Sequence, residues 1–470
     1  MSRSVLDVRV TPTSTITGVV ADLRTSFRNG RTRPLQWRTA QLDALAGLLV
    51  QHEQRFLDAL TSDLGKPAVE AYLGEVGFVL GEIGLARAQL AQWMAPEVVP
   101  MPPEQFGPGR SEILREPYGV VLVIGPWNYP FQLVLLPLIG ALAAGNTVVV
   151  KPSELAPASS EVLAELLPRY LDGVAVVQGG AEQTTALLAE QFDYIFYTGG
   201  GRVGRVVMEA AATHLTPVTL ELGGKSPAIV LGDADLDVTA HRLAMGKFFN
   251  AGQTCIAPDY VLVDRTVEAE LVDRLNAAIT QFYGDDPYRS ADYGRIVDDR
   301  HLARLAGLLA SGEVVTGGIV EVPDRYVSPT ILRHVAVDSP AMQDEIFGPI
   351  LPIIPVDGLD AAIDFVNGRD KPLALYVFGE DPKACEEVLA RTSSGGACVN
   401  GAITHITNPF LPFGGVGASG TGSYHGRATF ETFSHRRSVM WRSTEVDPPT
   451  QYPPYPPLAA LKHALGAPSA

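Results

Sequence analysis

The first hundred residues carry apolar side chains at helical spacing. Leucine and phenylalanine recur at steps of three and four within 42–49 and again within 56–64. Side chains at this spacing lie on one face of an α-helix. The pattern predicts a helical block over residues 12–95.

From Tyr118 onward, short β-branched runs alternate with helical stretches. The strand-like runs are 120–124, 147–150, 174–177, 194–197 and 218–220. Such alternation predicts parallel strands joined by right-handed crossovers, as in a doubly wound, Rossmann-like α/β sheet. A second series, with strand-like runs at 260–263, 350–355 and 373–378, predicts a second α/β domain that meets the first across a cleft.

Composition and charge exclude several classes of protein. Of the 470 residues, 46% are hydrophobic and 19% charged, as in a globular protein. A net charge of −16 argues against nucleic acid as the main partner, because binding phosphates needs clustered Lys and Arg. We find neither a signal-peptide core of about 7 to 15 apolar residues nor an apolar run of about 18 residues that could span a membrane.

Three cysteines, Cys255, Cys385 and Cys398, cannot form a complete disulfide framework, and no spacing typical of a metal site accompanies them. We therefore expect a reducing cytoplasm and no metal. Cys255 lies in a loop between a predicted helix (236–249) and the strand at 260–263. A nucleophilic thiol, whose free pKa is about 8.5, needs local stabilisation and a base. Taken alone, a single cysteine is more often a small buried residue. We assign Cys385 and Cys398 to packing.

A glycine pattern follows the strand at 194–197. Gly199, Gly201 and Gly204 fit GxGxxG between a strand and a helix, where backbone amides can approach a pyrophosphate. An acid about 20 residues further on commonly binds the ribose, and Glu221 is the candidate. The same letters occur within 415–420 without a leading strand, so the pattern alone decides little.

Two further motifs follow predicted strands. In KPSE, Lys151 and Glu154 can hydrogen-bond ribose hydroxyls, although a solvated pair in a turn explains them equally well. In GPWNYP, the amide of Asn128 is a neutral donor suited to an oxyanion, or an ordinary turn residue before proline.

Taken in order, PWNYP, KPSE, LELGGKSP, GQTCIAP and DEIFGPI resemble the aldehyde dehydrogenase family. The stretch 411–439 resembles its class 3 branch, which acts on fatty and aromatic aldehydes. The resemblance implies that Cys255 is the nucleophile and Glu221 the general base, which favours that role over ribose binding. It also implies that the Asn128 side chain and the Cys255 amide form an oxyanion hole.

The resemblance further implies NAD as cofactor, with NADP possible. The implied cofactor contacts are Lys151 and Glu154 with the adenosine ribose, Gly199 and Gly204 beside the pyrophosphate, and Glu345 and Phe347 with the nicotinamide half. Trp127 is also implied to contact the cofactor. Gly200 departs from the Ser or Asn common in the family, which puts a polar contact to the phosphate in doubt. Tyr129, Met245, Thr254 and Ile406 are implied to line the aldehyde tunnel.

These implications lead to one expected function: oxidation of a small-molecule aldehyde to a carboxylic acid through a cysteine thiohemiacetal and thioester. The alternatives are a CoA-acylating aldehyde dehydrogenase, a reductase run in reverse, and a non-catalytic binding or structural protein on the same fold. We expect a homodimer with an NAD(P)-binding domain (1–221), a catalytic domain (222–410), an oligomerisation or closing segment (411–445) and a proline-rich tail (446–470). A strand near 111–120 is expected to combine with the segment near 434–441 for oligomerisation.

Overall fold

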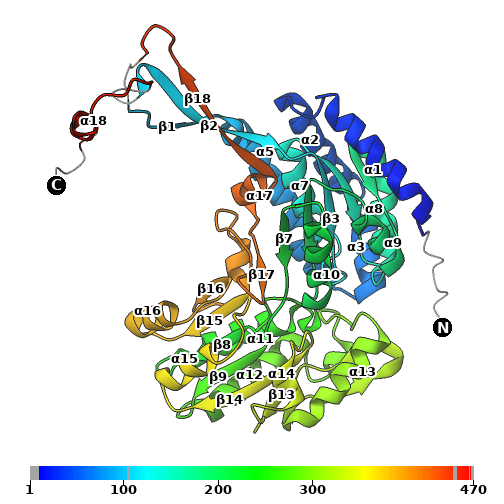
Figure 1. Cartoon of the computed structure of the whole chain (residues 1–470). Helices are drawn as coiled ribbons and strands as arrows, with labels where there is room; N and C mark the ends of the chain where they lie inside the picture. Colours follow the sequence, from blue (N-terminus) through cyan, green and yellow to red (C-terminus); the bar gives the residue numbers. More distant parts are fainter. Residues whose placement is uncertain (1–9, 103–105, 448–451, 465, 467–470) are drawn as a thin grey trace.

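The structure is a computed structural model that describes residues 10–102, 106–447, 452–464 and 466. Residues 1–9, 103–105 and part of the predicted proline-rich tail (448–451, 465 and 467–470) lie outside the described residues. Two α/β domains adjoin each other, and a β arm extends from one of them (Figure 1). The predicted α/β class is therefore confirmed.

The predicted helical block at the N-terminus is confirmed. It comprises α1 (Thr13–Arg28), α2 (Leu35–Gln51), α3 (Glu53–Leu64), α4 (Ala68–Ala71), a π-helical turn η1 (Tyr72–Val76) and α5 (Gly77–Met94). Helices α2 and α5 pack against α7 (Gln132–Ala144). Every residue of α7 is buried, which explains why this helix is apolar all round.

The first sheet has the strand order β17-β7-β6-β3-β4-β5. Its strands are β3 (Val120–Ile124), β4 (Thr147–Lys151), β5 (Val174–Val176), β6 (Tyr194–Thr198), β7 (Val218–Glu221) and β17 (Gly420–Thr421). All pair in parallel except β17. The chain runs outward from β3 through β4 and β5, then returns to β6 on the other side of β3. This reversal places a ligand crevice at the carboxyl ends of β3 and β6.

Helices cover both faces of this sheet. Val121 and Val123 belong to the core shared with α2, α5 and α7, whereas Val120, Leu122 and Ile124 belong to the core shared with α1. Successive side chains of a strand point to opposite faces, so a strand covered on both sides is apolar throughout. The remaining helices of this domain are α8 (Pro157–Tyr170), α9 (Ala181–Leu188) and α10 (Gly201–Ala212).

The second sheet has the order β10-β13-β14-β9-β8-β15-β16. Its strands are β8 (Pro227–Val230), β9 (Tyr260–Asp264), β10 (Glu313–Thr316), β13 (Thr330–Arg333), β14 (Ile350–Val356), β15 (Ala374–Phe378) and β16 (Gly396–Val399). The predicted runs correspond to β9, β14 and β15, and the sheet is completed by β8, β10, β13 and β16. The helices of this domain are α11 (Leu236–Phe248), α12 (Glu268–Tyr283), α13 (Asp299–Leu308), α14 (Pro340–Gln343), α15 (Leu359–Asn367) and α16 (Pro382–Arg391).

The arm consists of β1 (Glu97–Val99), β2 (Gly109–Pro117) and β18 (Ser434–Arg442) in the order β1-β2-β18. The expected pairing of the two distant segments is present, with Ser434 opposite Pro117. The arm strand ends at Pro117 rather than at Val120 as predicted, because Gly119, with φ of 150°, turns the chain between β2 and β3. Its role in oligomerisation stays a prediction.

Part of the segment 411–445 returns to the first domain. Gly420 in β17 pairs with Glu221 in β7, and α17 (Gly426–Thr432) packs on α7. In the tail, α18 (Leu458–Ala464) lies near the outer end of the arm (Figure 1). Among the residues that the structure describes, each helix is too short or too polar to span a bilayer.

Candidate active site

Cys255 lies in a tightly turned loop after α11. A 3₁₀ turn (Phe249–Gly252) follows the helix, and within it Asn250 and Ala251 have φ of 54° and 51°. At Gly252, with φ of 73°, an added Cβ would lie 2.3 Å from the carbonyl oxygen of Gly348. Only glycine fits this close approach.

Two cavities meet at Cys255. The first, of about 400 Å³, lies between the domains, and the second, of about 220 Å³, is almost wholly apolar. The first is lined by Pro126, Trp127, Asn128, Leu133, Thr198, Gly199, Gly200, Glu221, Leu222, Gly223, Cys255, His301, Arg304, Asp344, Glu345 and Phe347. The second is lined by Leu73, Gly74, Phe78, Tyr129, Gln132, Leu133, Met245, Phe249, Thr254, Cys255, Ile256, Ile403, Thr404, Ile406, Thr407 and Phe413. The thiol therefore has access to a mixed polar cavity on one side and to an apolar one on the other.

Glu221, at the end of β7, is a buried carboxyl without a hydrogen-bond partner among the described residues. It is 2% exposed, and this burial raises its pKa well above the ordinary 4.5. Burial also raises the pKa of the Cys255 thiol, and the negative charges of Glu345 and Glu221 add to the effect. The backbone N–H groups of Cys255 and Ile256 act in the opposite direction. An unpartnered carboxyl beside a thiol is available to accept a proton.

Asn128 follows β3 and is held against the cysteine loop. Its Nδ2 donates to the carbonyl oxygen of Gln253 at 3.0 Å, and its own carbonyl oxygen accepts from Nδ2 of Asn250 at 3.0 Å. A primary amide carries two N–H groups, and among the described residues only one of those of Asn128 has a partner.

One wall of the first cavity, the larger of the two, is aromatic. The ring of Trp127 lies edge-on to Phe347, with centroids 5.2 Å apart, and to His301, at 5.1 Å. Phe347 has φ of 47°, a strained conformation for a bulky residue that marks many ligand sites. Such a wall fits a flat heteroaromatic ring.

Glu345 lies beside this wall. A Cβ on Gly223 would lie 2.0 Å from its Oε2, so glycine makes room for the carboxyl. Burial, followed by the charge of Asp259, raises the pKa of Glu345 to about 8. The guanidinium of Arg304 donates to the carbonyl oxygens of Glu345 and Ile346 at 3.3 and 2.5 Å and thereby fixes the loop.

The glycine motif at β6 and α10 divides into two kinds of position. Gly199 donates its N–H to the carbonyl oxygen of Glu221 at 2.9 Å and lines the larger cavity, as does Gly200. A Cβ on Gly200 would meet no atom within 4 Å, so its backbone is open to a ligand, and a serine there would fit. Gly204 does not line this cavity. A Cβ at that position would lie 2.9 Å from Cδ2 of Leu222, so the glycine lets α10 pack closely.

Lys151 and Glu154 lie at the carboxyl end of β4, on the edge of the sheet where β3 and β6 end. Their Nζ and Oε2 atoms are 3.1 Å apart, and the lysine side chain is 3% exposed. Neither residue lines the larger cavity. They lie one strand further along the crevice, a position suited to the far end of an elongated ligand.

Sequence reasoning missed several lining residues. His301 and Arg304 come from α13, and Leu73 and Phe78 come from η1 and α5. No local motif distinguishes them in the sequence. By contrast, Tyr129, Met245, Thr254 and Ile406 all line the apolar cavity, as the resemblance implied.

Comparison with known proteins agrees with this geometry. The family model described as "Aldehyde dehydrogenase family" matches residues 3–439. The chain belongs to this family. It is 50% identical over 447 residues to the Mus musculus protein named "Aldehyde dehydrogenase, dimeric NADP-preferring", with 94% of this chain and 98% of the mouse protein covered.

Two further comparisons support the class 3 resemblance and the fold. The chain is 50% identical over 440 residues to the Homo sapiens protein named "Aldehyde dehydrogenase family 3 member B1", with 93% and 94% covered. The structure titled "Substrate bound state of Staphylococcus Aureus AldH" has a TM-score of 0.94 and 45% identity and covers 96% of this chain and 99% of that chain. The predicted aldehyde dehydrogenase of class 3 type is confirmed. Its reaction is the NAD(P)-dependent oxidation of an aldehyde.

Proposed function

We propose that this aldehyde dehydrogenase produces a carboxylic acid through a covalent intermediate on Cys255. The observation that carries the proposal is the position of Cys255 at the meeting point of the two cavities. The aldehyde enters through the apolar cavity. Once the Cys255 thiol has passed its proton to a base, the thiolate sulfur attacks the carbonyl carbon to form a tetrahedral thiohemiacetal.

The negative oxygen of this adduct needs hydrogen-bond donors. We assign them to the free N–H of the Asn128 side chain and the backbone N–H of Cys255. Asn128 is 3% exposed, so its amide acts in surroundings from which water is largely excluded. Donors fixed in such surroundings contribute about 3 to 4 kcal/mol to stabilising the transition state.

The larger cavity fits the nicotinamide half of NAD(P). NAD(P) bound there would supply the acceptor for the hydride that the collapsing adduct on Cys255 expels. Trp127 and Phe347 would hold the ring, Glu345 would bind its ribose, and the open backbone at Gly200, next to Gly199, would bind the pyrophosphate.

For the adenosine ribose we propose Lys151 and Glu154, at the carboxyl end of β4. Gly204 acts by letting α10 approach the sheet. The name of the mouse relative describes that protein as NADP-preferring, which supports the use of NADP here.

Glu221 is the proposed base for hydrolysis. The thioester left after oxidation must be attacked by water, and a carboxylate can remove the proton of that water without a metal. Glu221 lines the same cavity as Cys255 and has no competing hydrogen bond among the described residues. These properties favour water over CoA as the acceptor of the acyl group, and CoA-dependent acylation remains the second candidate.

The apolar lining of the smaller cavity favours aliphatic or aromatic aldehydes over charged ones. The test measures NAD(P)H formation across aliphatic chain lengths and aromatic aldehydes, with and without CoA, together with the acyl product. We expect the free acid and no dependence on CoA. Acyl-CoA as the product, or turnover that requires CoA, would contradict the proposal.

We further propose a cytoplasmic homodimer that uses the arm for assembly. The free state of Cys255, Cys385 and Cys398 supports a reducing compartment, and the name of the mouse relative describes that protein as dimeric. We propose that residues 1–221 form the NAD(P)-binding domain and residues 222–410 the catalytic domain. Residues 411–445 would form the oligomerisation or closing segment, and residues 446–470 the proline-rich tail. Light scattering should give about twice 50.2 kDa. A monomer or a tetramer would refute the dimer.

A further inference from the structure

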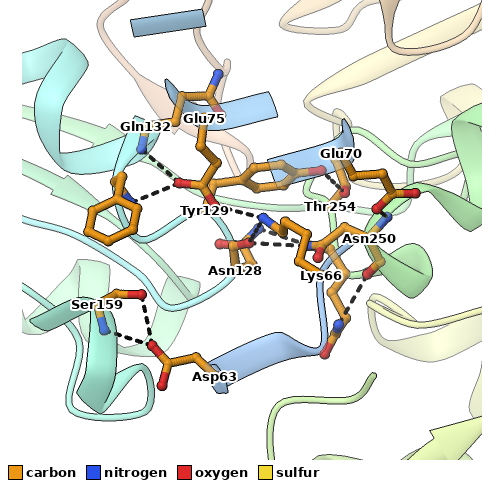
Figure 2. A network of polar contacts seen from close by, with 12 residues as sticks. Asp63, Lys66, Glu70, Glu75, Asn128, Tyr129, Gln132, Ser159, Asn250 and Thr254 are labelled. Carbon is orange, nitrogen blue, oxygen red and sulfur yellow. Dashed lines mark hydrogen bonds and ion pairs between the residues drawn. The ribbon is translucent and has the colours of Figure 1, made fainter. Parts of the chain in front are cut away.

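A buried ion pair lies directly beneath the proposed oxyanion hole, outside both cavities. Nζ of Lys66 is 2.7 Å from Oε1 of Glu75, and both side chains are 0% exposed (Figure 2). Removing two opposite charges from water is costly unless further hydrogen bonds satisfy them. The remaining hydrogen bonds of this pair therefore show which parts of the chain it fixes in place.

The lysine contacts the residue that carries the oxyanion donor. Lys66 follows Gly65, the left-handed C-cap of α3, and turns inward. Besides Glu75, its Nζ donates to the carbonyl oxygen of Asn128 at 3.0 Å and lies 4.0 Å from the centroid of the Tyr129 ring. Lys66 thus fixes the peptide between Asn128 and Tyr129.

The glutamate holds the other end of the same loop. Oε2 of Glu75 accepts from the backbone N–H groups of Phe131 and Gln132 at 2.9 and 3.0 Å. Gln132 is the first residue of α7, and a carboxylate is favourable at a helix N-terminus. The pair therefore holds the loop from Asn128 to Gln132 at both ends.

The network continues into the cysteine loop. Asn250 donates Nδ2 to the carbonyl oxygens of Asn128 and Gln253, at 3.0 and 3.1 Å, and joins the two loops (Figure 2). The hydroxyl of Tyr129 is 2.7 Å from Oγ1 of Thr254, the residue before Cys255. The two donors of the proposed oxyanion hole are thus held relative to each other through Asn128, whose carbonyl oxygen accepts from both Lys66 and Asn250.

We propose that Lys66 is a positioning residue for the oxidation step: by its bond to the Asn128 carbonyl it sets the direction of the side-chain amide, while Glu75 balances its charge. The inference rests on the proposed role of Asn128. A donor that is displaced rather than removed should slow adduct formation by about 10- to 100-fold, which is less than the loss of about 10² to 10³ on removing a donor.

The experiment separates positioning from charge balance. Lys66→Met leaves Glu75 buried and unpaired, whereas the double variant Lys66→Met/Glu75→Gln removes both charges. Thermal unfolding, NAD⁺ binding, the rate of the NADH burst and the rate of Cys255 alkylation by iodoacetamide are measured for each. The double variant should recover melting temperature relative to Lys66→Met, yet its burst should stay about 10- to 100-fold slower than wild type. Alkylation needs no oxyanion donor, so its rate should stay within twofold of wild type.

Two controls complete the comparison. Glu75→Gln keeps the lysine donor and should lose stability while its burst rate stays closer to wild type than that of the double variant. Asp63, three residues before Lys66, has a buried carboxyl that accepts from the backbone N and the Oγ of Ser159 at 2.8 and 2.7 Å and does not contact Asn128 (Figure 2). Asp63→Asn weakens these hydrogen bonds. This variant should have a lower melting temperature than wild type and the wild-type burst rate.

A double variant with the wild-type burst rate would overturn the positioning role. If the Lys66 variants do not fold, Asn250→Gly removes the other donor to the same carbonyl oxygen and tests whether holding that oxygen matters for the burst, since glycine tolerates the left-handed φ at that position. A normal burst in this variant would likewise overturn the inference. Asn128→Ala is measured in parallel. If its burst is slow and that of the double variant is normal, the positioning role of Lys66 is refuted while the oxyanion role of Asn128 stands. If the burst of Asn128→Ala is normal, the proposed oxyanion role is refuted too.

Discussion

Glu221→Gln should separate oxidation from hydrolysis. The substitution keeps the shape of the side chain and, because neither carboxyl oxygen has a partner among the described residues, breaks no hydrogen bond that they provide. We therefore expect a melting temperature no more than about 3 °C below that of wild type at neutral pH. Loss of a general base should slow deacylation by about 10² to 10⁴, equivalent to about 2.7 to 5.4 kcal/mol.

Stopped-flow measurement of NADH provides the assay. The variant should release close to one equivalent of NADH per Cys255 in a burst and then turn over slowly, because oxidation outruns hydrolysis. Glu82→Gln is a matched control: its carboxyl is also buried with a raised pKa, accepts from the N–H of Gly426 at 3.0 Å, and lines neither cavity. An unchanged steady state in Glu221→Gln would refute the reasoning. If the burst rate and the steady-state rate fell equally, Glu221 would act in a step before oxidation, namely the activation of the Cys255 thiol.

The raised pKa of Glu221 gives the same variant a pH signature. Desolvation raises the folded-state pKa above the ordinary 4.5, so the unfolded state releases its proton first as pH increases. Wild type should therefore lose stability relative to Glu221→Gln from about pH 4.5 upward, until the folded carboxyl also ionises. Thermal unfolding from pH 4 to 9 measures this difference, and a difference independent of pH would contradict the burial argument.

Three further variants test the remaining assignments. Cys255→Ala should abolish oxidation while NAD⁺ binding and melting temperature stay near wild type; turnover near the wild-type rate would exclude the nucleophile. Glu154→Gln should raise kcat/KM for NADP relative to NAD, because it removes a charge that repels a 2′-phosphate, and an unchanged ratio would place Glu154 away from that ribose. Ile406→Trp should fill part of the apolar cavity of about 220 Å³ and lower kcat/KM for aromatic and long aldehydes more than for acetaldehyde. An equal effect on all aldehydes would argue against this route of entry.

Elements with local signals could be predicted from the sequence. A strand covered on both faces must be apolar throughout, so β3 and β6 could be predicted from short apolar runs. The motifs around Cys255, Glu221 and Asn128 could also be recognised from the sequence, because the turns that orient these side chains depend on neighbouring glycines and prolines. Gly252 illustrates this, since no other residue fits against Gly348.

The distant segments that complete the site could be identified only from the folded structure. Lys66 and Glu75 occur in a stretch that the sequence predicts merely to be helical, and nothing local marks them as a buried pair. Their burial results from the packing of η1 and the end of α3 against the loop before α7, which assembles only when the helical block meets the sheet. His301 joins Trp127 for a similar reason: the two domains bring α13 to the carboxyl end of β3. Contacts of this kind depend on the distances between elements, and periodicity along the chain carries no information about those distances.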